Sequence, residues 1–290
     1  MDCQVFPAGV LSDYRYAVCL SLYGGKLLLS RHRERSTWEM QGGHIEPGET
    51  PRQAAARELF EESGALSFTL SPLFDYRTEC GTTAAVFLAR VRELGPLPES
   101  EMAQVQSFDA PPEALTYPHL VASALEALAA RPALNLEPVG AEEADRLGRY
   151  LQMYLYELSG VYGDGMDETG RFPYPYLALY FTEPERHPYF FRAADKIVGF
   201  AMVNRHPVLP EPVDFCLAEF TIFPAYRGRG YALAAVQALT EDHPGRWQLK
   251  YSPANTVGAA LWEAVAGLYG GRVTSLESGE RALCFTAGTP

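Results

Sequence analysis

Acidic residues at helical spacing are the feature of this sequence best suited to chemistry. Glu58, Glu61 and Glu62 stand three and four residues apart, so a helix would project their carboxylates from one face. Clustered negative charge is costly unless a cation neutralises it, and carboxylate oxygens are ligands that Mg²⁺ favours. We therefore expect a divalent-metal site that can act on a diphosphate, with these carboxylates on the solvent side of the helix.

The sequence supplies a start and an end for the helix that must hold these acids. Thr50 and Gln53 form a capping box, with Pro51 at the first helical position. Gly64 follows Ser63 and provides the left-handed C-cap that commonly ends a helix. The face away from the acids is apolar, which predicts an amphipathic helix packed on a core. That apolar seam consists of Ala55, Ala56 and Leu59.

Glycines and a single arginine around the helix complete a longer motif. A solvated acidic surface helix would account for the charges but not for these residues. In order and spacing the segment resembles the Nudix box, and the resemblance implies hydrolysis of a small nucleotide, a nucleoside diphosphate linked to another moiety, with Mg²⁺ or Mn²⁺ as cofactor. The matching positions are Gly43, Glu49, Arg57, Glu58, Leu59, Glu61, Glu62, Gly64 and Ala65.

The resemblance also implies a role for each polar position of the motif. Glu58, Glu61 and Glu62 would bind the metal, and one of them would act as general base. The backbone carbonyl of Gly43 would be a further metal ligand. Arg57 would pair with Glu49 and hold the helix against the preceding loop.

Residues outside the motif offer further contacts. Arg31 and Arg33 precede the metal loop and could receive substrate phosphates, although short basic runs are often only solvated surface. Gly42 and Gly43 would let a substrate approach the backbone. Many Nudix enzymes use one more glutamate outside the box, and Glu101 is the candidate here.

Composition and charge fit a globular protein of two domains. The chain has 290 residues, of which 47% are hydrophobic and 21% charged. A net charge of −12 argues against bulk nucleic acid as a partner, because phosphate backbones are bound by a surplus of lysine and arginine. No apolar run approaches the roughly 20 residues that cross a bilayer, and the first residues lack a leader pattern. Scattered cysteines without CxxC pairing indicate reduced thiols, so we expect a cytoplasmic protein without membrane binding.

The domain boundary is expected just after a helix over residues 117–130, where Arg131 and Pro132 stop the helical pattern. Residues 1–131 would then form the Nudix domain, an α/β/α sandwich around a mixed sheet. Residues 132–290 would form a second domain. The oligomeric state stays open, and a dimer is compatible with the sequence.

A strand, a glycine turn and a helix follow one another in the second half. Residues 215–223 have the composition of a strand, and apolar residues at helical spacing begin at Leu233. Glycines between them let backbone N–H groups approach a ligand, and the helix N-terminus adds partial positive charge. This unit is suited to a pyrophosphate, although such turns also occur merely as connections. The turn consists of Arg227, Gly228, Arg229, Gly230, Tyr231 and Ala232.

The arrangement of Arg227, Gly230 and Ala232 after a strand resembles the acyl-CoA loop of the GNAT acetyltransferases. The resemblance implies a mixed, mostly antiparallel sheet flanked by helices, with acetyl-CoA or another acyl-CoA as the bound group and an amine as acceptor. Strand residues would bind the pantetheine arm, the glycine turn would bind the pyrophosphate, and the following helix would complete the site. The implied contacts outside the turn are Phe220, Thr221, Ile222, Asn255 and Trp262.

Catalysis in the second half depends on two positions. Glu219 stands where the family places its general base, although an acid in an apolar strand can also be a solvated position. Trp262 stands where many GNAT enzymes have a tyrosine acid, and an indole N–H has no transferable proton. Tyr231 and Tyr269 are conceivable substitutes.

Three functions are compatible with this α+β sequence. The first is a bifunctional enzyme, a Nudix hydrolase joined to an N-acyltransferase. In the second, a GNAT-like module binds acyl-CoA without transferring it and regulates the hydrolase. In the third, the partner domain is purely structural, which the glycine turn disfavours.

Overall fold

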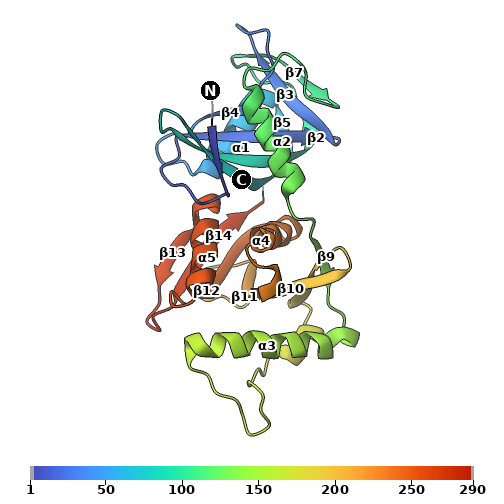
Figure 1. Cartoon of the computed structure of the whole chain (residues 1–290), viewed down its shortest axis with the longest axis vertical. Coiled ribbons are helices and arrows are strands. Elements are labelled where there is room, and N and C mark those ends of the chain that lie inside the picture. Colours follow the sequence, from blue (N-terminus) through green and yellow to red (C-terminus); the bar gives the residue numbers. More distant parts are fainter. Residues whose placement is uncertain (1–2, 289–290) are drawn as a thin grey trace. The chain divides into compact units, whose positions relative to one another are not determined.

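The computed structural model describes residues 3–288 and contains two seven-stranded sheets (Figure 1). The chain separates into two compact units at Arg131 and Pro132, with Ala264–Gly271 grouped with the first unit. None of the described helices is long and apolar enough to cross a membrane. Cys19, Cys80, Cys216 and Cys284 are free thiols. The side chain of Cys3 is not among those that the structure describes.

The first sheet is mixed and has the strand order β1-β5-β6-β2-β3-β7, with β4 paired to β2. The pair β2–β6 is parallel, whereas β2–β3, β2–β4, β3–β7, β1–β5 and β5–β6 are antiparallel. The elements are β1 (Cys3–Phe6), β2 (Tyr16–Tyr23), β3 (Lys26–His32), β4 (Gln41–His44), α1 (Pro51–Ser63), β5 (Ala65–Thr78), β6 (Thr83–Leu94), β7 (Met102–Phe108) and α2 (Pro118–Ala130).

Alternation along β2 places a helix on each face of this sheet. Ala17 and Cys19 belong to one buried cluster, which α1 completes through Leu59. Val18 belongs to the other, which α2 completes through Val121. The expected α/β/α sandwich is therefore present, and its two cores are separated by the sheet.

The second sheet has the order β13-β14-β12-β11-β10-β9-β8. Strands β8 to β11 pair antiparallel with their neighbours, as do β13 and β14, and β11 pairs parallel with β12. The elements are β8 (Asn135–Pro138), η1 (Ala141–Glu143), α3 (Ala144–Tyr162), η2 (Leu177–Phe181), β9 (His187–Ala193), β10 (Lys196–Asn204), β11 (Phe215–Ile222), η3 (Pro224–Tyr226), α4 (Tyr231–Asp242), β12 (Gly245–Tyr251), α5 (Thr256–Tyr269), β13 (Arg272–Ser275) and β14 (Arg281–Ala287).

Helices cover both faces of the second sheet. On one face α3 buries Leu147 and Leu151 against Phe190 and Phe200. On the other, Phe220 of β11 meets a ring of α5 with centroids 5.2 Å apart. Thr221 of β11 pairs with Phe200 and Phe220 pairs with Ala201, so neighbouring residues of β11 point to different faces.

Candidate functional sites

The caps expected for α1 are present and fix where its acids lie. Thr50 Oγ1 accepts a hydrogen bond from Gln53 N, while the Gln53 side chain accepts one from Thr50 N. Gly64 ends the helix in the left-handed conformation, with φ of 73°. A helix fixed at both ends presents its carboxylates to the preceding loop at one register only.

Arg57 connects α1 to that loop. Its Nε and Nη2 donate to the two carboxylate oxygens of Glu49 at 2.8 and 2.9 Å, and Nη2 also donates to His44 O at 3.0 Å. The remaining nitrogen, Nη1, donates to Glu58 at 2.7 Å and Glu61 at 3.2 Å. Hydrogen bonding from Arg57 lowers the pKa of Glu49 to about 2. The pairing expected between Arg57 and Glu49 is thus present as a bidentate contact.

Glu62 is buried and Glu58 is only partly exposed, so the expectation that both face solvent is wrong. Glu62 is only 5% exposed, and its Oε2 accepts a hydrogen bond from Gly42 N at 2.8 Å. The Glu58 side chain is 13% exposed, whereas that of Glu61 is 47% exposed. The cause is tertiary: the glycines of β4 admit the carboxylates, and a Cβ added at Gly43 would lie 2.2 Å from Glu58 Oε1.

Burial changes the protonation of these acids. It raises the pKa of Glu62 to about 8, against a smaller opposing effect from the Gly42 hydrogen bond. Burial also raises the pKa of Glu58, although Arg57 opposes it. Both carboxyl groups therefore hold a proton more readily than exposed acids do, because the site gives their charged forms little solvation.

Two further acids lie close to this pair. Glu101 is near enough to Glu58 and Glu62 to raise the pKa of both electrostatically, and its carboxylate is 3.6 Å from His32 Nε2. Glu39 is 6% exposed, pairs with Arg35 at 2.6 Å and also raises the pKa of Glu62. The sequence reasoning did not identify Glu39, and an acid within a short apolar strand was the available signal.

The donor set fits a hard divalent cation. It consists of carboxylate oxygens and nearby backbone carbonyls, which suit Mg²⁺ or Mn²⁺. Among residues 3–288, no three His, Cys, Asp or Glu side chains are arranged around a common metal position. Instead, Arg57 Nη1 bridges Glu58 and Glu61. The acids that the sequence grouped are thus together, and a guanidinium provides the positive charge between two of them.

The two arginines expected to receive phosphates make internal contacts. Arg31 donates to Gln104 Oε1 at 3.0 Å and lies over the Trp38 ring. Arg33 donates through Nε to Met102 O at 3.4 Å. Both side chains are therefore tied to β7 or to residues next to it.

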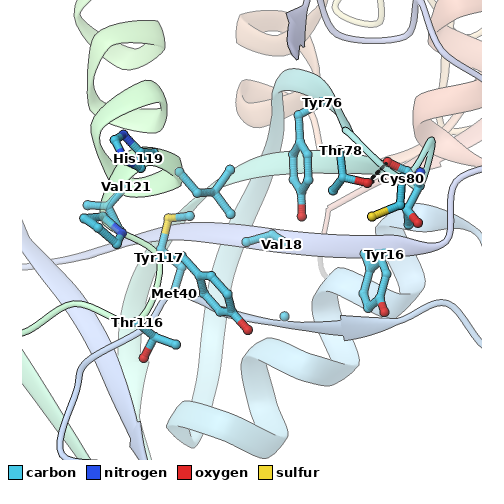
Figure 2. Close-up of a pocket in the computed structure, with 14 residues that line it drawn as sticks. Tyr16, Val18, Met40, Tyr76, Thr78, Cys80, Thr116, Tyr117, His119 and Val121 are labelled. Atoms are coloured by element: carbon cyan, nitrogen blue, oxygen red, sulfur yellow. Dashed lines mark hydrogen bonds between the residues drawn. The ribbon is translucent and has the colours of Figure 1, made fainter. Parts of the chain in front are cut away.

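A cavity of about 490 Å³ opens beside Gly42 on the face of the sheet that carries α2. Figure 2 shows Tyr117 and His119 at one end and Tyr16 with Cys80 at the other. Gly42 and Val18 contribute the floor, since both are paired on neighbouring strands. Aromatic walls with a few polar groups suit a flat heterocycle. The sequence reasoning did not find this cavity, because its residues come from four separate segments.

The second candidate site is the turn between β11 and α4. Gly228 and Gly230 have φ of 71° and 79°, in the left-handed region that favours glycine. Within residues 3–288, no hydrogen bond to a backbone carbonyl is found for the amides of Gly228, Arg229 and Gly230, which lie outside the helices and strands. The helix N-terminus at Tyr231 adds further free amides. Such a turn can cradle a pyrophosphate.

Arg227 is exposed, but its guanidinium is bound by other residues of the same unit. Its Nη1 and Nη2 donate to the Glu157 carboxylate, and its Nε donates to Ile222 O at 2.7 Å. The arginine thereby connects the turn to α3. Hydrogen bonding from Arg227 lowers the pKa of Glu157.

The other expected cofactor contacts are partly engaged in the fold. Asn255 Oδ1 accepts a hydrogen bond from Gly258 N at 3.1 Å and so caps the start of α5. Trp262 is 7% exposed and packs edge-on against Phe220. Thr221 is buried. Tyr231 contacts the Tyr226 ring and Tyr269 is buried.

Glu219 lies among tyrosines. Its carboxylate accepts hydrogen bonds from the hydroxyls of Tyr174 and Tyr154. Burial raises the pKa of Glu219 to about 6, against these hydrogen bonds and the nearby Lys250. The loop that supplies Tyr174 therefore contributes to the surroundings of the expected general base.

Two family models match the chain. The NUDIX domain matches residues 13–128, and the Acetyltransferase (GNAT) family matches residues 153–267. An RNA pyrophosphohydrolase from Yersinia enterocolitica is 50% identical over 40 residues, which are 14% of this chain and 23% of that protein. The chain therefore aligns with only about a quarter of this relative.

Solved structures resemble each half separately. A Bacillus subtilis pyrophosphohydrolase is 25% identical with a TM-score of 0.40, covering 44% of this chain and 89% of its own. An acetyltransferase from Thermus thermophilus is 20% identical with a TM-score of 0.41, covering 53% of this chain and 97% of its own.

Proposed function

Since residues 13–128 form a Nudix domain and residues 153–267 form a GNAT acetyltransferase domain, we propose that the chain is a bifunctional enzyme. Its first activity is hydrolysis of a small nucleotide in which a nucleoside diphosphate is linked to another moiety. Its second is transfer of an acyl group from acyl-CoA to an amine. We place the domain limits at residues 1–131 and 132–290.

The hydrolase proposal rests on one observation above all: the partly exposed carboxylate of Glu58 lies against Gly43, and the buried carboxylate of Glu62 accepts a hydrogen bond from Gly42 N. Glu58, Glu61 and Glu62 would hold Mg²⁺ or Mn²⁺, with Glu101 nearby and the Gly43 carbonyl as a further ligand. When bound, the metal would neutralise diphosphate oxygens and lower the pKa of a bound water.

The other groups of this domain orient the substrate. The aromatic cavity beside Gly42 would receive the nucleoside, so the diphosphate lies across the backbone of Gly42 and Gly43. A Cβ at Gly43 would collide with the Glu58 carboxylate, so glycine there keeps this acid beside the backbone that the diphosphate would cross. Arg57 and Glu49 fix the angle between α1 and the backbone of Gly42 and Gly43. One of the clustered glutamates accepts the proton of the attacking water.

The acyltransferase proposal rests on the amides of the turn at Gly228–Gly230 and on the position of Glu219. The amides would hold the pyrophosphate of acyl-CoA, with Phe220, Thr221 and Ile222 along the pantetheine arm. Glu219 would accept a proton from the acceptor amine, and Tyr154 and Tyr174 would hold its carboxylate in place.

One observation favours a second candidate for this domain, an acyl-CoA-binding module without transfer. Trp262 is buried against Phe220, and its indole cannot protonate a departing thiolate. Proximity of amine and thioester could still support transfer, so the two candidates differ in turnover and agree in binding.

Three measurements test the proposals. Release of a nucleoside monophosphate with Mg²⁺ should fall by orders of magnitude in Glu58→Gln and in Glu62→Gln, and turnover near wild type in both would refute the hydrolase. Acetyl-CoA should raise the melting temperature of the wild type but not of Gly230→Trp. Gly170→Trp, at an open loop glycine of the same unit, is the control. Acetylation of a panel of amines then separates transfer from binding.

A further inference from the structure

A second cavity, of about 600 Å³, adjoins the cavity proposed for the nucleoside. Tyr16, Cys80 and Thr82 line both cavities, so the two share a wall. Gly42 lines the first and His44 lines the second. These two residues flank Gly43 on β4; Glu58 lies against Gly43, and Glu62 accepts a hydrogen bond from Gly42 N. The two cavities therefore meet at the β4 backbone that the diphosphate is proposed to cross.

The second cavity has positive charge, in a chain whose net charge is −12. Arg15, Arg77 and His44 line it, with Asp13 as the single carboxylate. Among residues 3–288, neither Arg15 nor Arg77 forms an ion pair, whereas Arg57 forms three. Two guanidiniums without carboxylate partners thus line one cavity beside an acidic centre.

Both arginines are anchored at the same place in the sheet. Arg15 N donates to Thr83 O at 2.9 Å, and Arg77 is the register partner of Thr83 in the β5–β6 pair. Ile45 N donates to Arg15 O at 3.0 Å, which connects Arg15 to the end of β4. The Arg77 guanidinium lies over the Phe6 ring, 5.4 Å from its centroid. A rigid backbone therefore carries both cations, as a binding site requires.

The wall between the cavities is aromatic. The rings of Tyr16 and His44 lie 4.2 Å apart between centroids, and these residues are register partners across β2 and β4. A substrate that spans both cavities would place an uncharged ring system on one side and an anionic group on the other. Its diphosphate would pass beside the glycines between them.

From this arrangement we propose that the moiety on the far side of the diphosphate carries an anionic group of its own, a carboxylate or a phosphate, which binds Arg15 and Arg77. The inference rests on the proposed hydrolase and narrows its substrates. Nucleoside diphosphates with a charged second moiety are favoured over those with a neutral one. Asp13 sets the position of the anion by repelling it from one side of the cavity.

The test measures binding to the full chain with Glu62→Gln, which prevents turnover and keeps an acceptor for Gly42 N. Affinities with Mg²⁺ are compared within pairs that differ only in the distal anion. UDP-glucuronate against UDP-glucose tests a carboxylate, and UTP against UDP or ATP against ADP tests a phosphate. We expect the anionic member to bind about tenfold more tightly in at least one pair, as one charge-assisted contact would give.

Arginine variants identify the cause of that preference. Arg15→Gln and Arg77→Gln should each reduce it severalfold, with little effect on the neutral member. Arg77→Lys, which retains the charge, should keep part of it. Arg92→Gln, at an exposed arginine of β6 outside the cavity, is the control for loss of positive charge. Melting temperatures confirm that each variant is folded.

Equal affinity within every pair, or no binding of any of these ligands, would overturn the inference. So would equal losses for charged and neutral ligands in the arginine variants, because that result indicates a structural role. Turnover by the wild type separates this inference from the proposed function. Hydrolysis without any preference for the anion defeats the inference alone. A preference that persists in binding, without hydrolysis of any diphosphate, defeats the proposed hydrolase alone.

Discussion

A single added methyl group at Gly43 should separate the fold of the first domain from its catalysis. In Gly43→Ala the new Cβ would lie 2.2 Å from Glu58 Oε1 and 2.6 Å from its Cδ. Ordinary contacts begin at 3.4 Å, so the carboxylate must move by roughly 1 Å or more. The nearest atoms belong to the end of a flexible side chain, so the backbone of β4 need not shift.

The expected size of the effect follows from that displacement. A misplacement of about 1 Å in a catalytic site costs about 100-fold in rate, equivalent to about 2.7 kcal/mol. The free energy of unfolding should fall by only about 1 kcal/mol, because Glu58 can rotate and overpacking is partly relieved. Turnover should therefore fall far more than stability.

The assay compares Mg²⁺-dependent release of nucleoside monophosphate with denaturant unfolding of the same preparation. Gly48→Ala is a matched control in the same loop, since a Cβ there meets nothing within 4 Å while the φ of +90° makes alanine strained. It should lose about 1 kcal/mol of stability and keep its turnover. Glu58→Asp, which shortens the side chain, should cost less in the Gly43→Ala background than alone. Turnover within twofold of wild type in Gly43→Ala would refute the reasoning.

Three further predictions concern the second domain. Burial raises the pKa of Glu219 in the folded protein to about 6, above its ordinary value of 4.5. Protonated Glu219 therefore stabilises the fold fully below about pH 4.5, and this stabilisation is lost as the pH rises through 6. Glu219→Gln should remove this pH-dependent loss of stability, which is worth about 2 kcal/mol by pH 7. The same variant should abolish the rise of acyl transfer near pH 6. Identical stability curves against pH for the variant and the wild type would contradict the prediction. Glu157→Gln should weaken acetyl-CoA binding as much as Arg227→Ala does, because Arg227 positions the glycine turn by pairing with Glu157. Weaker binding in Arg227→Ala alone would contradict this and indicate that Arg227 contacts a phosphate directly. Trp262→Tyr should raise the rate of acyl transfer without tightening acetyl-CoA binding, and an unchanged rate would show that loss of a thiolate acid does not limit transfer.

Local patterns predicted much of each fold. Thr50, Pro51 and Gly64 predicted the limits of α1, and the structure has α1 over Pro51–Ser63. The strand before the glycine turn was expected over residues 215–223 and is found over Phe215–Ile222. The helix expected over residues 117–130 is found over Pro118–Ala130. Caps, alternation and turns act over a few residues, so the sequence contains them directly.

Burial and long-range partners could not be predicted in the same way. Glu62 was expected in solvent and is buried, where Gly42 N from another element donates a hydrogen bond to its carboxylate. Arg227 was expected at a phosphate, and Glu157, seventy residues away, holds it instead. The aromatic cavity beside Gly42 collects residues from distant segments, so no local pattern could have revealed it.

The sequence by itself determined which chemical groups this protein has and which of them belong together on one helix or one turn. The acids of α1 and the glycines before α4 were identifiable because their spacing within an element sets their relative placement. Only the tertiary structure decided how those groups are solvated, which arginines pair and which stay free, and what cavity lies beside them. Solvation and pairing depend on which distant segments pack together, and a pattern within one segment does not contain that information.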